Sequence, residues 1–140
     1  MKLNIAIISL ISVLTGSFAI ANTLGLENNS DGTWDVTYSS DGDIAGFQFN
    51  VDGAMINSAS GGDAAASGMF IQTLGDMVLA FFIGGGSIPA GCGTLVELNL
   101  SGEATGLFNV LFSDPNAQAI YFEYYEENDE PVLGCTDESA

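Results

Sequence analysis

Carboxylates, thiols and aromatic rings are the main side chains here that could take part in catalysis or ligand binding, because the sequence has no histidine and a single basic residue, Lys2. Serine or cysteine nucleophiles activated by histidine, histidine-containing zinc sites and lysine Schiff bases are therefore excluded. A carboxylate pair, as used in glycoside hydrolysis, is the remaining catalytic option. The candidate pairs, Asp41 with Asp43 and Asp35 with Glu97, fall in turns or on alternating solvent faces, where charge is ordinary. We therefore predict a protein that is not an enzyme.

Carboxylates in loops also raise the question of calcium, whose natural ligands are aspartate and asparagine oxygens. Asp31 follows two asparagines, and Asp41 and Asp43 flank a glycine. None of these segments has the spacing of an EF-hand loop. The same residues are what tight turns require, so calcium and simple turn formation both stay open as interpretations. Calcium is the only candidate cofactor.

Exposed flat aromatic rings would suit glycan binding, because ring faces stack on sugar faces. Trp34 and Tyr38 share one side of one predicted strand, as two members of a binding platform would. Two residues of a sandwich core would show the same spacing. Tyr124 and Tyr125 lie beside an acidic segment and are candidates for exposure.

Two cysteines, Cys92 and Cys135, are the only thiols. In an exported protein they are free to form a disulfide, which would stabilise the fold by roughly 3–4 kcal/mol in the loop-entropy picture. The alternative is that Cys135 pairs within a separate repeat and Cys92 is a small core residue.

The charge balance is strongly acidic, with 18 Asp and Glu and a net charge of −17. All the acidic residues follow residue 21, so the chain after that point has no cation at all. It cannot neutralise phosphates, which excludes nucleic acid and anionic lipid surfaces as partners. A solvated, salt-adapted surface and specific cation binding are both compatible with this composition.

Both ends of the chain differ in character from its centre. Residues 1–21 combine Lys2, a short apolar stretch and Ala19-Ile20-Ala21, which is the pattern of a cleavable signal peptide. We therefore predict export and no membrane span after cleavage. Residues 126–140 begin as an acidic linker that ends at Pro131.

Alternation with period two dominates between these ends, in segments that are rich in β-branched and aromatic residues. Turn-forming clusters interrupt it about every ten residues, so we predict an all-β fold, an antiparallel β-sandwich of about eight to nine strands, over residues 22–125. Asp63–Gly68 is expected to be a loop because of its glycine neighbours. Val78–Ile83 is the most aggregation-prone candidate for an edge strand. The alternating segments contain Trp34–Tyr38, Phe47–Val51, Leu95–Leu100 and Ile120–Tyr125.

Segments of the alternating region carry a family resemblance. Asp43–Val51, DIAGFQFNV, is similar to a "V-A-G-F-Q-F-D-L" strand that is typical of cohesin-type modules. Ser87–Leu98 is similar to their "lPaGsGtLatltF" segment, and Gly102–Leu107 matches the next turn. The resemblance covers roughly residues 23–125 and implies a jelly-roll sandwich with an adhesion or docking role, related to carbohydrate-binding modules.

The tail carries a second resemblance. Gly134–Ala140, GCTDESA, is similar to the opening of "G-C-T-D" repeats in large exported proteins of marine bacteria. It implies that a Cys-containing repeat starts here.

Three functions are compatible with these observations. The first is a non-catalytic binding or adhesion module, secreted or displayed at the cell surface, that docks a protein partner. The second is a carbohydrate-binding accessory module of a polysaccharide-degrading system. The third is a structural surface subunit that self-assembles through its edge strands.

Overall fold

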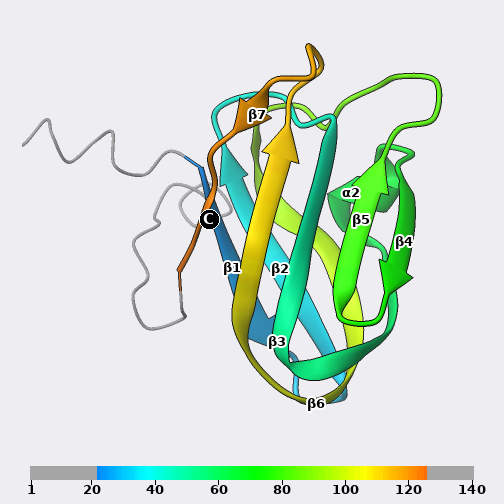
Figure 1. Ribbon diagram of the computed structural model, residues 1–140, viewed down its shortest axis with the longest axis vertical. Coiled ribbons are helices and arrows are strands. Elements are labelled where there is room, and N and C mark those ends of the chain that lie inside the picture. The colour runs from blue at the N-terminus through cyan, green and yellow to red at the C-terminus, as the bar shows by residue number, and fades with distance from the viewer. Residues whose placement is uncertain (1–21, 126–140) are drawn as a thin grey trace, which may run out of the picture.

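The computed structural model describes residues 22–125 and shows an all-β fold, as predicted (Figure 1). The signal peptide predicted for 1–21 and the linker and repeat predicted for 126–140 lie outside the described residues. The eight strands are β1 (Thr23–Asn28), β2 (Thr33–Ser40), β3 (Gly46–Ser60), β4 (Phe70–Leu74), β5 (Met77–Phe81), β6 (Gly91–Ser113), β7 (Ala119–Ile120) and β8 (Glu123–Tyr124).

One continuous sheet folds over to make both layers of the sandwich. Its order is β4-β5-β3-β6-β2-β1-β8, with β7 paired to the end of β6. The long strand β6 pairs with β2 through its first part and with β3 through its later part. β1 and β2 consequently lie behind β3 and β6 in Figure 1. Apart from β1 and β8, which are parallel, neighbouring strands are antiparallel.

The core lies between the two layers and is built by the alternation seen in the sequence. Trp34, Val36 and Tyr38 of β2 point inward, and each is less than one-tenth exposed. From the opposite layer, Phe47 and Phe49 of β3 join the same buried cluster. Burying side chains of this size supplies most of the driving force for folding, at about 1.5–3 kcal/mol each.

A stack of phenylalanines closes one part of this core. The Phe47 ring lies 5.9 Å from Phe49 and 5.4 Å from Phe112, measured between centroids. Phe112 in turn stacks on Phe122 at 3.8 Å. Phe122 lies between β7 and β8, so the prediction of one strand over Ile120–Tyr125 is wrong. The segment divides into two short strands, of which β7 pairs with β6 and β8 pairs with β1. A single straight strand could not reach both neighbours.

The segment predicted to be a loop at Asp63–Gly68 contains a short helix, α2 (Gly62–Ala66). The fully buried side chain of Ala64 and a hydrogen bond to Asp63 anchor this helix on the sheet. Gly62 allows the close approach, because a Cβ there would lie 2.4 Å from the Leu95 carbonyl oxygen. The glycines that argued against a helix thus let it pack against β6.

Val78–Ile83 is not an edge strand, contrary to prediction. Its residues up to Phe81 form β5, which pairs with β4 on one side and with β3 on the other. The edge is β4. Hydrophobicity identified the segment as a strand, but only tertiary pairing decides which strand is outermost.

No helix among residues 22–125 has the length and apolar character needed to cross a bilayer.

Candidate functional site

The outer surface of strands β4, β5, β3 and the later part of β6 carries a concentration of large exposed apolar side chains. We call it the apolar face. Its exposed members are between 37% and 70% accessible to solvent, and half-buried Leu79 lies among them. Contiguous exposed apolar surface on a soluble domain commonly marks an interaction site. The face comprises Phe70, Leu74, Leu79, Phe81, Phe108 and Leu111.

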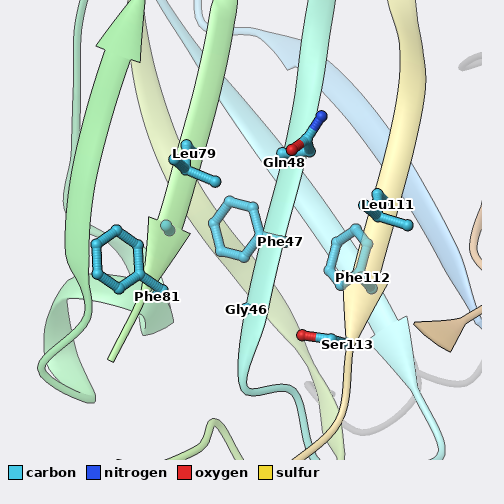
Figure 2. Close-up of a pocket in the computed structure, with 9 residues that line it drawn as sticks. Gly46, Phe47, Gln48, Leu79, Phe81, Leu111, Phe112 and Ser113 are labelled. Carbon is cyan, nitrogen blue, oxygen red and sulfur yellow. The ribbon is translucent and has the colours of Figure 1, made fainter. Parts of the chain in front are cut away.

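Strand register places these side chains in rows across the sheet. Gln48 of β3 is paired with Leu79 of β5 on one side and with Leu111 of β6 on the other. Figure 2 shows these three side chains in line across adjacent strands. Phe70 and Phe81 pair in the next row and make an edge-to-face contact with centroids 5.4 Å apart.

A shallow depression opens in this face where β3 begins. Gly46 is paired with Phe81 on one side and with Ser113 on the other, and it has no side chain to fill the space between them. Leu79 and Leu111 line the same depression (Figure 2). The lining is mainly apolar, so the depression suits an apolar group rather than an ion.

A β-bulge in β6 puts both Phe108 and Leu111 on this face. Residues three apart in a regular strand point to opposite sides of the sheet. The register against β3 shifts between Gln48 and Asn50, which inserts one extra residue into β6. Asn109 lies at this point with φ 54°, a left-handed conformation that asparagine tolerates better than most residues. The bulge is therefore a structural requirement of the apolar face.

One end of the apolar face is polar and acidic. The Asn50 side-chain Nδ2 donates to Asp76 Oδ1 at 2.9 Å, and the main chain of Val51 donates to the Asp76 carbonyl at 2.8 Å. Asp52 follows on the same strand, with its Oδ2 accepting from Thr105 Oγ1 at 3.2 Å. We call Asp52 and Asp76 the acidic end.

Sequence reasoning did not identify this surface. The pairing of Gln48 with two leucines is long-range, and the bulge breaks the alternation that would have grouped Phe108 with Leu111. One available signal was the charge distribution: Asp76 is the only charged residue between Asp63 and Glu97.

Trp34 and Tyr38, the candidates for a glycan platform, are core residues, with 7% and 5% of their surfaces exposed. Of the two interpretations left open by their spacing, the structure places them in the core. The Tyr38 Oη donates to Asp63 Oδ2 at 2.6 Å, which ties β2 to helix α2. Burial, the hydrogen bond to Asp63 and the negative charge of that carboxylate all raise the pKa of Tyr38.

The other two aromatic candidates lie at the opposite edge of the sheet from the apolar face. Tyr124 is half-buried, packs against the core and, in β8, pairs with Leu24 of β1. Tyr125 is also half-buried, and its Oη donates to Glu123 Oε1 at 3.3 Å. No exposed platform joins these rings to Trp34 or Tyr38.

The three carboxylates considered for calcium are each part of a turn or loop. Asp31 Oδ1 accepts from the Thr33 hydroxyl at 2.6 Å and from the Thr33 main-chain nitrogen at 3.0 Å, and the hydroxyl bond is the main reason that the pKa of Asp31 is lowered. Asp43 Oδ1 accepts from the Ala90 main-chain nitrogen at 3.1 Å, and Asp41 lies in the loop after β2. Within residues 22–125, no group of three or more Cys, Asp or Glu is placed to hold a metal ion.

Cys92 lies in β6 opposite Ser39 and is not a free thiol. Cys135 lies outside the described residues, so a disulfide between Cys92 and Cys135 stays one of the interpretations that the sequence leaves open.

Comparisons with known proteins locate the fold among the cohesins. The described sandwich is similar to a non-cellulosomal cohesin of the hyperthermophilic archaeon Archaeoglobus fulgidus, with a TM-score of 0.55 and 11% identity over 76% of this chain and 88% of that one. It is also similar to a chain of the complex between a CaDoc0917 variant and CaCohA2, with a TM-score of 0.48 and 14% identity over 75% and 95% of the two chains. No family model matches the sequence. No curated protein matches it either. The fold is thus a cohesin-like β-sandwich, as the sequence resemblance implied.

Proposed function

We propose that this domain is a non-catalytic docking module that binds another protein through the apolar face. The observation that carries the proposal is the grouping of exposed Phe81 and Leu111 with half-buried Leu79 around the depression at Gly46. A sheet surface that combines a large apolar area with a polar margin has the composition of a protein–protein interface. The cohesin-like fold supports the same function by analogy.

The chemistry of the domain is consistent with binding rather than catalysis. Asp35 and Glu97 lie directly opposite each other on β2 and β6, on the side of the sheet that faces away from the core residues Trp34 and Val36. The depression at Gly46 contains no ionisable side chain among its lining residues. A general acid or base needs to reach a bound substrate, and this site provides none.

The setting that we propose is extracellular. The signal-peptide pattern of residues 1–21 and the resemblance of Gly134–Ala140 to repeats of exported proteins both support display outside the cell. The module would then present the apolar face to a protein partner from a larger secreted or surface-bound chain.

The test compares two exposed apolar residues, one on the apolar face and one away from it. Leu111 is 53% exposed on the face, and Met55 is 56% exposed beyond the acidic end. The wild-type domain, Leu111→Ser and Met55→Ser are used to capture exported proteins of the source organism. Any captured protein is then purified and titrated against all three by calorimetry.

We expect Leu111→Ser to weaken binding of the purified partner at least about fivefold, because truncating a hot-spot residue near the centre of an interface costs more than about 1 kcal/mol. Met55→Ser should bind like the wild type. Equal binding by all three proteins would show that the apolar face is not the docking site. Binding of an insoluble glycan by the wild type, insensitive to Leu111→Ser, would favour the carbohydrate-binding alternative instead.

A further inference from the structure

We infer that the partner presents an apolar anchor side chain to the depression at Gly46 and a cationic group to the acidic end, Asp52 and Asp76. This inference rests on the proposed docking function and specifies the chemistry of what docks. It also fixes the orientation of the partner along β3, because the two features lie at opposite ends of the apolar face.

The depression is shallow, and only its floor at Gly46 is closely bounded. A Cβ built on Gly46 would lie 3.2 Å from Ser113 Oγ and 3.4 Å from the Ala80 carbonyl oxygen. A single methyl group would therefore already occupy its floor. Flanked by Phe81 and Leu111, the depression can receive one apolar side chain from a partner, and anchor residues of this kind dominate interface energetics.

The acidic end carries charge that a partner has to match. Asp76 is held at the β4–β5 turn by Asn50, and Asp52 is exposed on the adjoining part of β3. The chain from residue 22 to 125 contains no lysine, arginine or histidine, so the domain itself cannot neutralise these carboxylates. A partner that covered these two carboxylates without pairing them would incur a desolvation cost, whereas a lysine or arginine of the partner would offset that cost.

The spacing between the two features follows from strand geometry. Asn50 and Asp52 are four and six residues beyond Gly46 on β3, which corresponds to about 13–20 Å at the rise of a β-strand. The anchor and the cationic group of the partner should be separated by a similar distance.

A second copy of this domain does not fit this description. It would bring only carboxylates to the acidic end, and the repulsion between like charges would disfavour contact. The occupant that matches the charge is a different protein with basic residues beside an apolar patch.

The test uses three synthetic amphipathic helical peptides of about 18 residues, long enough to span roughly 27 Å. All share one leucine stripe with a phenylalanine near one end, and their other ends carry two Lys, two Gln or two Glu. Binding is measured by fluorescence anisotropy at about 20 mM and about 500 mM NaCl, because surface electrostatics weaken over this range.

We expect the Lys peptide to bind at least about tenfold more tightly than the Gln peptide at low salt, and the Glu peptide to bind least. Asp52→Asn with Asp76→Asn should weaken Lys-peptide binding about fivefold or more. The matched control, Asp35→Asn with Glu97→Gln, removes the same number of charges from a different surface and should change binding less than about twofold.

A Gly46→Ala variant tests the anchor. It should weaken all three peptides by a similar factor, since it places a methyl group on the floor of the depression without touching the acidic end. A thermal melt checks that the variant is folded, because Ser113 has to move slightly to admit the methyl group. Undiminished binding by Gly46→Ala would overturn the anchor assignment.

The outcomes separate the two levels of the proposal. Suppose that Leu111→Ser weakens peptide binding, but that removing the charges of Asp52 and Asp76 has no more effect than removing those of Asp35 and Glu97. Docking at the apolar face then stands, and the cationic group of the partner does not. If the Lys peptide binds Leu111→Ser as well as the wild type, the docking function itself fails. No measurable binding of the Lys peptide at millimolar concentration also overturns this inference.

Discussion

The hydrogen bond from Tyr38 to Asp63 shows how one buried polar group organises two elements. Tyr38 lies in the core, so its hydroxyl needs a partner, and the Asp63 carboxylate 2.6 Å away provides one. The same bond keeps α2 against the sheet. A hydrogen bond to a charged acceptor contributes about 1.5–3 kcal/mol, more than an average neutral one.

We predict that Tyr38→Phe lowers the free energy of unfolding by about 1.5–3 kcal/mol at neutral pH. The pKa of Tyr38 is raised in the folded protein, so the unfolded tyrosine ionises first, near its ordinary pKa of about 10. Wild-type stability should therefore fall as the pH rises above about 10, and this part of the decline should vanish in Tyr38→Phe. Urea unfolding at pH 7 and at pH 10.5 or so measures both effects. An identical loss of stability with pH in the two proteins would contradict this account.

At the scale of elements, the bulge in β6 determines what the docking surface contains. Without the extra residue at Asn109, either Phe108 or Leu111 would turn into the core, and the apolar face would lose a member. The positive φ of Asn109 is the conformational requirement of this arrangement.

We predict that Asn109→Gly is neutral or slightly stabilising, whereas Asn109→Val lowers stability by about 1–2 kcal/mol, because a β-branched residue is strained at positive φ. Chemical denaturation of both variants measures the difference. Val110→Thr, one residue away and outside the left-handed region, is the control for loss of side-chain packing. Equal stability of the Gly and Val variants would show that the bulge is not held in this conformation.

Sequence reasoning works at this scale where local alternation decides the structure. The inward side of Trp34–Tyr38 and Phe47–Val51 follows from period two alone, as does the all-β class. It fails where pairing partners decide, as at β5, which the sequence cannot distinguish from an edge strand. It also fails at Asn109, because the bulge removes the periodicity on which the prediction depends. The apolar face contains β5 and depends on the bulge at Asn109, so local alternation does not predict it.

At the scale of the whole molecule, the dominant feature is a surface on which every described charge is negative. No internal ion pair can compensate the repulsion among these carboxylates, so added salt should stabilise the fold by screening it.

We predict a gain on the order of 1 kcal/mol between about 10 mM and 1 M NaCl, which for a domain of this size corresponds to a rise in Tm of about 4–8 °C. Calorimetry in NaCl, in choline chloride and in CaCl2 at equal ionic strength separates screening from specific binding. Equal shifts in the three salts indicate screening alone. A much larger shift in CaCl2 would instead support a calcium site, and no shift in any salt would contradict the role of repulsion.

The parallel pairing of β1 with β8 gives the domain a mechanical property. Thr23 lies opposite Glu123, and the main-chain nitrogens of Glu123 and Tyr125 donate to the carbonyls of Asn22 and Leu24 at 3.1 and 2.9 Å. Tension applied through residues 22 and 125 pulls these two strands past each other in opposite directions. It therefore loads their hydrogen bonds together, in shear, and does not peel them apart one at a time. A domain held in this way can transmit a pull while the core between its layers stays closed.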